Sequence, residues 1–275
     1  MDDIVSGSFT QRRWQFWRPQ SIRVVDWNID RGLRLPEIAD FLASQQADLI
    51  ILQEVDLNAR RTRRVNVAEE LARKLGMNFV FGREFEELTQ GSPRSAAYHG
   101  QATLSRWCLS NPRIIRFRSQ SGFWRPRWFL PRTSPFQERL GGRIALATEV
   151  SIPGTILTIY NLHLESRGSD ELRLSQLQET LDDSATYSHA TPVLVAGDLN
   201  FDISRGAAAS AVQQAGFRNV FGQSQFGTRP PHNLFGNARS IDWALLAGEP
   251  QATLAKVHTS VKASDHYPIS FTLRF

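Results

Sequence analysis

Six apolar stretches of this sequence end in, or are interrupted by, side chains that can do chemistry. These side chains are Asn28 and Asp30, Glu54, His163, Asp198 and Asn200, Asp242, and Asp265 and His266. A carboxylate beside a buried strand is costly unless a metal ion or a hydrogen-bond partner compensates it. One such residue is usually explained by a turn, but six sites in one chain are harder to explain in that way. Because strand ends at one edge of a sheet lie close together, the pattern indicates one shared site.

The residue types restrict the chemistry of such a site. The sequence has no Ser nucleophile elbow, no phosphate loop of the G-x-x-x-x-G-K type and no His/Cys zinc spacing. It offers carboxylates, two amides and two imidazoles, and hard oxygen ligands favour Mg²⁺ or Mn²⁺ over zinc. A spare carboxylate can activate water, and imidazoles can stabilise negative charge on phosphorus. The set predicts metal-assisted hydrolysis of a phosphoester, with Mg²⁺ or Mn²⁺ as cofactor.

Six short motifs resemble those of the endonuclease/exonuclease/phosphatase superfamily: in order, WNIDRG, LQEV, NLHLES, GDLN, SIDWAL and SDHYPI. That group includes pancreatic-type deoxyribonucleases, apurinic endonucleases, tyrosyl-DNA phosphodiesterases, inositol polyphosphate phosphatases and sphingomyelinases. The resemblance extends from about Ile22 to Phe275, so residues 1–21 are expected to be an N-terminal extension to a domain at 22–275. It implies an α/β fold, a four-layer α/β/β/α sandwich of two mixed sheets packed face to face with helices outside.

The resemblance also implies a metal neighbourhood. Glu54 matches the principal metal ligand of the superfamily, and Asn28 and Asp30 lie beside it in the WNIDRG motif. Asp265 of the SDHYPI motif completes the neighbourhood. These four residues are the expected ligands of Mg²⁺ or Mn²⁺.

Five further residues take catalytic roles by the same resemblance. Asp198 positions or deprotonates the attacking water, and Asn200 orients that water or a phosphate oxygen. His266 contacts the scissile phosphate and is held by Asp242. His163 binds a phosphate oxygen from the other side, as in the deoxyribonuclease branch, whereas apurinic endonucleases carry Tyr in that region.

Two further positions are weaker candidates for substrate binding. Arg143 begins a strand where related bacterial sequences also keep Arg, although a structural role suits it equally well. His99 lies in AAYHGQ, near a glycine beside which the family often has a polar residue. Both Arg143 and His99 are expected as candidate substrate-binding residues.

Positive charge is concentrated in two segments of the chain. The net charge is +5, from 32 basic and 27 acidic residues, and residues 58–64 and 111–139 are rich in Arg. Such segments on an otherwise acidic chain favour an anionic ligand over a merely solvated face. Within residues 116–132, Arg125 and Arg127 alternate with Trp and Phe, which suits a wall that binds phosphates and unstacked bases. The alternative is that these aromatic side chains form a small core under the sheet.

The substrate is the least determined property. The stretch HLESRGSDELRLSQL resembles the tyrosyl-DNA phosphodiesterase branch, which favours a nuclease or DNA-end-processing phosphodiesterase with nucleic acid, DNA in particular, as substrate. The alternative is a phosphodiesterase or phosphatase acting on lipid head groups or inositol phosphates at a membrane, because Trp and Arg together also suit an anionic interface. A non-catalytic binding module would need a broken motif, and each motif is intact. The sequence implies no obligate protein partner.

Strands and helices that could hold these motifs follow from the apolar patterns. Strands are predicted at residues 21–29, 48–55, 192–200, 240–246 and 269–275, and residues 143–164 as two antiparallel strands hinged at Pro153 and Gly154. Helices are predicted at residues 35–45, 67–76 and 169–183. With no domain boundary in between, a single α/β domain is expected.

Bulk composition fits a globular enzyme. The 275 residues are 41% hydrophobic, and no apolar run approaches the roughly 18 residues that a membrane span needs. The first 20 residues lack the apolar region of a signal peptide. Cys108 is the single cysteine, which rules out an internal disulfide and a Cys-rich zinc site. A cytoplasmic location is expected.

Overall fold

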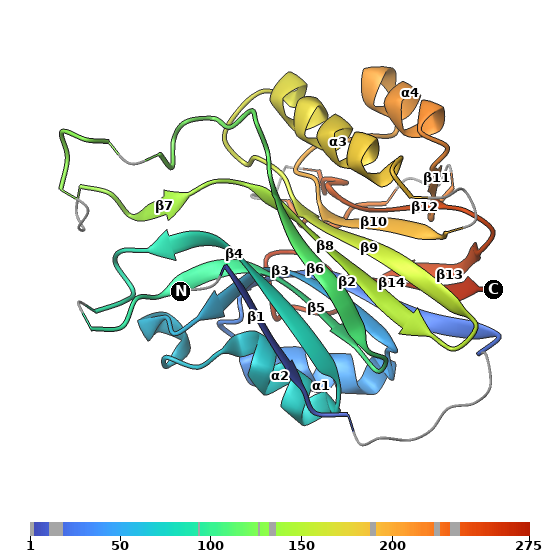
Figure 1. Cartoon of the computed structure of the whole chain (residues 1–275), viewed down its shortest axis with the longest axis horizontal. Helices are drawn as coiled ribbons and strands as arrows, with labels where there is room; N and C mark the ends of the chain where they lie inside the picture. Colours follow the sequence, from blue (N-terminus) through green and yellow to red (C-terminus); the bar gives the residue numbers. More distant parts are fainter. Residues whose placement is uncertain are drawn as a thin grey trace.

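Two β-sheets pack face to face, and helices cover the outer face of each sheet (Figure 1). The structure, a computed structural model, describes residues 3–10, 19–92, 94–125, 127–131, 136–187, 191–222, 226–231 and 237–275. Among these residues one sheet has eight strands and the other has six. The expected four-layer α/β/β/α sandwich is confirmed.

Both sheets are mixed. The larger has the order β1 (Ile4–Ser8), β4 (Asn78–Glu87), β5 (Tyr98–Ser105), β3 (Leu49–Leu57), β2 (Ser21–Arg31), β14 (Ile269–Arg274) and β13 (Gln251–Val257), and β7 (Arg139–Gly141) also pairs with β4. The smaller has the order β11 (Arg218–Asn219), β12 (Asp242–Ala247), β10 (Val193–Asp198), β9 (Thr155–His163), β8 (Ile144–Ile152) and β6 (Leu109–Arg116). The pairs β2–β3 and β9–β10 are parallel, and the other described pairs are antiparallel.

Four α-helices form the outer layers of the described chain. They are α1 (Leu35–Gln45) and α2 (Val67–Leu75) on the larger sheet, and α3 (Asp170–Ser184) and α4 (Gly206–Gln214) on the smaller (Figure 1). A short 3₁₀ helix, η1 (Arg60–Thr62), precedes α2. Local capping fixes two of the ends, because the side chain of Asn66 accepts a hydrogen bond at the start of α2 and that of Ser169 does so at the start of α3. No helix of the described chain is long and apolar enough to span a bilayer.

The space between the sheets is apolar at one end and polar at the other. On β2, Ile22 and Val24 belong to the inter-sheet core, and Asp26 and Asn28 continue the same face because side chains alternate along a strand. Three other strands change in the same way along their inner faces: β3, β9 and β10 pass from apolar residues to Gln53, to Asn161 and His163, and to Asp198. The polar ends converge, which creates the candidate site inside the sandwich.

Irregular backbone marks the site end of β2 and β3. The pairing of β3 with β5 shifts register between Leu52 and Val55, and Glu54 in this bulge has φ 51°. On β2, Asp30 and Arg31 have φ 42° and φ 67°. Left-handed conformations are unfavourable for such residues and are found where surrounding structure enforces them, often at functional sites. The bulges turn Glu54 and Asp30 out of the strand alternation.

The predicted elements are confirmed, but several elements were not predicted. The three expected helices correspond to α1, α2 and α3, and the expected strands to β2, β3, β8, β9, β10, β12 and β14. Sequence patterns did not reveal β4, β5, β6, β7, β11, β13 or α4. Residues 4–8, within the segment expected as an N-terminal extension, form β1 and pair with β4 at the edge of the larger sheet.

Candidate active site

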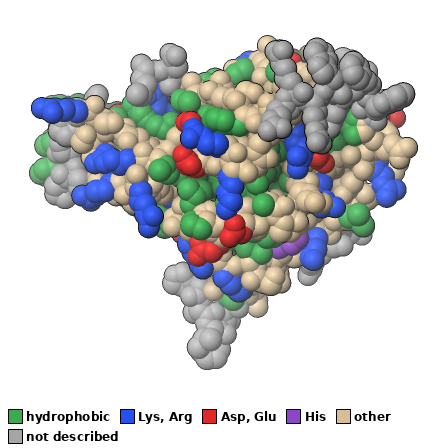
Figure 2. Space-filling view, turned by 90° about the horizontal axis from the view of Figure 1, so that it is seen from below, with side chains coloured by type: hydrophobic (Ala, Val, Ile, Leu, Met, Phe, Trp, Pro, Cys, Tyr) green, Lys and Arg blue, Asp and Glu red, His purple; other side chains and the backbone are tan. Residues whose placement is uncertain are grey.

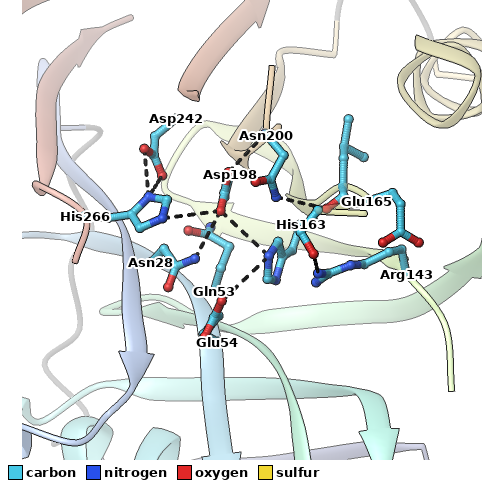
Figure 3. A network of polar contacts seen from close by, with 12 residues as sticks. Asn28, Gln53, Glu54, Arg143, His163, Glu165, Asp198, Asn200, Asp242 and His266 are labelled. Carbon is cyan, nitrogen blue, oxygen red and sulfur yellow. Dashed lines mark hydrogen bonds and ion pairs between the residues drawn. The ribbon is translucent and has the colours of Figure 1, made fainter. Parts of the chain in front are cut away.

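The polar side chains at the inner strand ends form one continuous network (Figure 3). Two groups within it bring possible metal-ligating atoms within 4.8 Å of one another: Asp198, Asp242 and His266, and Glu54, His99 and His163. Asp198 stands between the two groups, because its Oδ2 is 3.7 Å from Nε2 of both His163 and His266. The sequence-predicted catalytic residues therefore lie together.

Asp242 and His266 form a buried carboxylate–imidazole pair. Both Asp242 oxygens are 2.9 Å from Nδ1 of His266, so this nitrogen carries a proton and Nε2 faces Asp198. The indole of Trp27 fixes the backbone of His266 by donating to its carbonyl at 2.9 Å. Burial opposes a positive imidazole, but the carboxylates of Asp242 and Asp198 raise the pKa of His266 to about 10. His266 is a cation at neutral pH.

Asp198 is a buried carboxylate that lies between the imidazoles of His163 and His266. Its Oδ1 accepts from the backbone N–H of Asn200 at 3.0 Å, and its Oδ2 accepts from Nδ2 of Asn28 at 3.1 Å. Burial raises the pKa of Asp198 above its usual range, while the nearby His266 opposes that change. The preceding Gly197 has φ 141°, and a Cβ there would lie 2.0 Å from the carbonyl oxygen of Leu162. Only glycine allows β10 to approach β9 this closely beside Asp198.

Glu54 and His163 lie on the opposite side of Asp198. Nε2 of His163 is 3.9 Å from Oε1 of Glu54, and Nδ1 of His163 is 3.6 Å from Oε2 of Glu84. Burial alone would raise the pKa of Glu54, but the imidazoles of His99 and His163 and the guanidinium of Arg31 hold it well below its usual range. Glu54 is therefore ionised and its side chain keeps 21% of its surface exposed, whereas His163 is buried.

His99 is held by a second buried ion-pair network. Its Nδ1 is 3.1 Å from Oδ1 of Asp56, and Arg61 donates to both oxygens of Asp56 at 2.7 Å. Arg61 also donates to Glu87 at 3.2 Å. Burial opposes ionisation of Asp56, but the hydrogen bonds from Arg61 and His99 keep its pKa below the usual range. His99 is fully buried, so it offers no exposed surface for the expected substrate contact.

Of the expected metal ligands, Glu54 alone belongs to one of the two groups of possible ligand atoms, and Asp30 and Asp265 are each paired with an arginine. Asp30 is half-buried and paired with Arg31, whose Nη1 is also 3.6 Å from Oε2 of Glu54. The exposed Asp265 pairs with Arg229 at 2.8 Å. Burial raises the pKa of Asp30, and the negative charges of Asp265 and Glu54 act in the same direction. Carboxylate oxygens that repel one another fit a hard divalent cation such as Mg²⁺ or Mn²⁺. The donor chemistry is therefore compatible with the expected cofactor.

The side-chain oxygen of Asn28, expected to bind a metal ion, is used in a hydrogen bond within the protein. Oδ1 of Asn28 accepts from the backbone N–H of Asp30 at 3.1 Å, and its amide nitrogen donates to Asp198. Asn28 thus links the backbone at Asp30 to the carboxylate of Asp198. Asn200 likewise uses its amide, which donates to the carbonyl of Leu164 at 3.1 Å.

Arg143 is buried, and both of its terminal nitrogens are hydrogen-bonded. Its Nη1 donates to Glu84 at 2.6 Å and its Nη2 to Ser166 at 2.9 Å. Negative charge of Glu84 outweighs burial and raises the pKa of Arg143. In this arrangement Arg143 supports Glu84 and through it His163, which is the structural alternative considered for this residue.

The long β6–β7 loop projects from one end of the sandwich (Figure 1). Its base is tied beside Arg143, because the Gln120 side chain donates to the Arg143 carbonyl and accepts from its N–H, both at 2.8 Å. Trp124 is buried against Phe85, with ring centroids 5.4 Å apart, as the small-core alternative supposed. Trp128 and Phe129 behave differently and are 95% and 62% exposed.

Arg125 and Arg127 are also exposed on this loop, and Arg132 lies outside the described residues. At the end of the molecule where the loop projects, Figure 2 shows hydrophobic and basic side chains together. The loop is therefore split: its base packs as a core, and its tip presents aromatic and basic side chains to solvent.

Sequence reasoning missed the buried residues that support the site. Gln53 donates to Asp26 at 2.8 Å and to Asn161 at 2.9 Å, and Asn161 donates in turn to backbone carbonyls of β3 and β5. Alternation would have revealed Asp26, because it shares a face of β2 with Asn28. Glu84 had a weaker signal, as an acid inside the aromatic stretch NFVFGREF.

Comparison with known proteins agrees with this geometry. The family model described as "Endonuclease/Exonuclease/phosphatase family" matches residues 27–266. No curated protein matches the chain. Among solved structures, an endonuclease/exonuclease/phosphatase from Beutenbergia cavernae is similar with a TM-score of 0.68 and 18% identity, over 94% of this chain and 72% of that one.

Two TDP2 structures have a similar fold. Truncated Caenorhabditis elegans TDP2 gives a TM-score of 0.63 at 17% identity, over 93% of this chain and 98% of that one. D. rerio TDP2 complexed with a single-strand DNA product gives 0.62 at 17% identity, over 94% and 100%. At these identities the structural matches establish the fold alone, and the family model establishes membership: the chain belongs to the endonuclease/exonuclease/phosphatase family, whose members are generally metal-dependent phosphoesterases.

Proposed function

We propose that this protein hydrolyses phosphodiester bonds of nucleic acid, DNA ends in particular, with a divalent cation held near Glu54. The observation that carries the proposal is the position of Asp198. One of its oxygens is 3.7 Å from Nε2 of both His163 and His266, so a buried carboxylate lies between two imidazoles. That arrangement offers a base for water beside groups that can meet the charge of a phosphate.

Asp198 has the features of a general base. Its pKa is raised by burial, which makes it a better proton acceptor than an exposed Asp. Hydrogen bonds from Asn28 and from the N–H of Asn200 fix the orientation of the carboxylate. In the proposed reaction Asp198 positions the attacking water and accepts its proton.

His266 and His163 meet the phosphate from two sides. Nδ1 of His266 is occupied by Asp242, so its cationic Nε2–H is free to donate to a non-bridging oxygen. His163 offers Nε2 from the side of Glu54. A preorganised charge of this kind is worth most where negative charge develops in the transition state.

The oxygen cluster of Glu54, Asp30 and Asp265, with Asn28 beside it, would hold Mg²⁺ or Mn²⁺. When bound, such an ion supplies positive charge to the phosphate and lowers the pKa of water. Glu54 is already ionised, which a metal ligand requires.

The β6–β7 loop supports a nucleic-acid substrate. Its exposed tip combines Arg125 and Arg127 with the aromatic faces of Trp128 and Phe129. Arginine suits phosphates and aromatic rings suit unstacked bases, so the tip fits a single-stranded end. A distant structural neighbour, D. rerio TDP2, was crystallised with a single-strand DNA product, which agrees with this class of substrate.

A second candidate is hydrolysis of phosphoesters at a lipid surface. Trp128 is 95% exposed beside Arg side chains, and this pairing also suits an anionic membrane interface. The same catalytic residues would serve a lipid head group or an inositol phosphate.

A substrate panel tests both candidates. Purified protein is assayed with Mg²⁺ or Mn²⁺ on duplex, single-stranded and abasic DNA, RNA, 5′-phosphotyrosyl ends, inositol phosphates and sphingomyelin vesicles. Asp198→Asn should lower kcat by on the order of 10²–10⁴, and Asp202→Asn in the same loop should not, since among the described residues Asp202 bonds to its neighbours Ser204 and Arg205. Release of phosphate or phosphocholine without cleavage of nucleic acid would move the proposal to lipid. No hydrolysis of any member of the panel would contradict it.

A further inference from the structure

We propose that Glu54, His99 and His163 form a nitrogen-containing metal site that prefers a first-row transition metal, such as Mn²⁺, Co²⁺ or Zn²⁺, to Mg²⁺. This proposal depends on the proposed function only because Glu54 is also one of the oxygen ligands proposed there. Two imidazoles and one carboxylate are a recurring ligand set for transition metals, whereas Mg²⁺ is held by oxygen.

The three donor atoms already lie together. One ligand atom from each of Glu54, His99 and His163 falls within 4.8 Å of the others. The three residues come from β3, β5 and β9, so the two sheets meet at this point. The bulge that gives Glu54 its φ of 51° turns its carboxylate toward the two imidazoles.

A carboxylate lies near the Nδ1 nitrogen of each imidazole, and that of His99 is hydrogen-bonded to it. Asp56 lies 3.1 Å from Nδ1 of His99, and Glu84 lies 3.6 Å from Nδ1 of His163. A carboxylate only accepts hydrogen bonds when ionised, so Asp56 selects the His99 tautomer with the proton on Nδ1 and leaves Nε2 as a ligand. Metal-binding histidines are typically held in this way.

Both carboxylates, Asp56 and Glu84, are themselves held by arginine. Arg61 donates to both oxygens of Asp56, and Arg143 donates to Glu84. Such pairs keep the carboxylates ionised and fix their positions inside the protein. On the His99 side the site thus has an outer layer of hydrogen bonds, from His99 through Asp56 to Arg61, of the kind that supports metal-binding histidines.

An unpartnered nitrogen points to a ligand. His99 is 0% exposed, and its buried Nε2 has no hydrogen-bond partner among the described residues. Leaving a buried polar atom unpaired is costly, so a missing partner at such a position requires an explanation. A metal ion between His99, His163 and Glu54 supplies that partner.

The partly exposed side of the cluster keeps room for substrate. Glu54 retains 21% of its side-chain surface, whereas both imidazoles are buried. Three protein ligands with an open direction are typical of a catalytic metal site. When the site holds an ion, Nε2 of His163 is a ligand and no longer a direct phosphate contact.

Direct metal binding provides the test. Co²⁺ is titrated into metal-free protein and followed by its visible spectrum, and Mn²⁺-loaded protein is studied by pulsed electron paramagnetic resonance for coupling to imidazole nitrogen. His99→Gln should lose part of the nitrogen coupling. It should also weaken Co²⁺ binding by more than the roughly 10–100-fold that loss of an outer hydrogen-bond partner costs, with little change in Mg²⁺ affinity. His258→Gln is the matched control, because His258 bonds to Ser270 away from the cluster.

A second variant keeps the test valid if His99→Gln fails to fold. Asp56→Asn retains every ligand but removes the charge that selects the His99 tautomer, and it should weaken Co²⁺ binding by about 10–100-fold. Thermal unfolding of each variant shows whether the fold is retained. Absence of nitrogen coupling in the wild type, or equal Co²⁺ affinity in folded His99→Gln, would overturn the site.

The outcome is separable from that of the proposed function. Asp198→Asn should remain able to bind Co²⁺ with nitrogen coupling while losing hydrolysis. If the wild type cleaves nothing in the substrate panel yet shows nitrogen-ligated Co²⁺, the proposed function fails and the metal site stands. If it cleaves nucleic acid with only oxygen-ligated metal, the reverse holds.

Discussion

Both oxygens of Asp242 lie 2.9 Å from Nδ1 of His266, so a buried carboxylate fixes one side of an imidazole whose other side faces Asp198. The pair joins β12 of the smaller sheet to the loop before β14 of the larger sheet. It determines which nitrogen of His266 carries a free N–H and keeps the ring positive. The pH dependence of the protein should follow from this relationship.

Asp242→Asn should shift the alkaline limit of activity to lower pH. The pKa of His266 is raised from 6.5 to about 10, largely by Asp242, and the phosphate contact needs the protonated form. Without the carboxylate, His266 should lose its proton nearer to neutral pH. The profile of kcat/KM against pH and an NMR titration of His266 both measure the change. An unchanged alkaline limit would show that His266 is not the group that titrates.

Stability should report the same ionisation. A group whose pKa is higher in the folded state stabilises the fold fully below its unfolded pKa, and the gain is lost as pH rises through the folded value. For His266 that loss extends from about pH 6.5 to about pH 10. Wild-type protein should therefore lose stability across this window in denaturant unfolding, and Asp242→Asn should lose less. Equal slopes in the two proteins would contradict the raised pKa.

Asp198→Asn and His266→Ala should each lower kcat by on the order of 10²–10⁴, the usual effect of removing a general base or a charge-stabilising group. Asp198→Asn should leave the midpoint of thermal unfolding unchanged or higher, because burial penalises the ionised carboxylate and Asp242 repels it. Steady-state kinetics and thermal unfolding separate the two effects. A joint loss of activity and stability in both variants would reassign these residues to a structural role.

The positions of the candidate catalytic residues could be predicted because they follow clear apolar strands. Asp198 ends the apolar run PVLVAGD, and His163 ends TILTIYNLH, so their spacing alone indicated a shared edge. The parallel pair β9–β10 then places His163 directly opposite Asp198 in the register of the sheet. Local pattern and tertiary arrangement agree at these strands.

The residues behind the site could not be predicted because their strands lack a strong local signal. Strand β5 is buried along its whole length, yet its sequence YHGQATLS is mainly polar and small, and strand preference depends on packing against neighbours. His99 and its partner Asp56 were therefore not connected. The bulge at Glu54 was equally hidden, because a register shift depends on both paired strands.

The Arg-rich segment at residues 58–64 shows why charge runs are ambiguous. Arg61 is used inside the protein, where it pairs with Asp56 and Glu87. Arg60, Arg63 and Arg64 remain exposed. A count of charges along the sequence cannot separate these two uses, since the partners of Arg61 are supplied by β3 and β4.

Removal of divalent cations should abolish turnover, and Mg²⁺ or Mn²⁺ should restore it. Glu54→Gln keeps the shape but loses the charge of the central oxygen donor, so its metal affinity should fall by at least the roughly 10–100-fold seen when an outer-shell partner is lost. Isothermal titration of each metal measures the change, with Glu37→Gln on the exposed side of α1 as control. Full activity after exhaustive chelation would exclude the metal-dependent mechanism.

The tip of the β6–β7 loop should act in binding and not in chemistry. Arg125→Ala with Arg127→Ala should raise KM for the true substrate and leave kcat unchanged, because these contacts hold ground state and transition state alike. Trp128→Ala should add to the effect if bases stack on the ring, which is 95% exposed. On nucleic acid the slope of log affinity against log salt should become shallower by about 0.7 for each lost phosphate contact on a single strand. Arg73→Ala with Lys74→Ala removes the same charge from α2 and should alter neither KM nor the slope. Unchanged KM and slope in the loop variant would remove the loop from the substrate site, and loss of vesicle binding alone would assign it to a lipid surface.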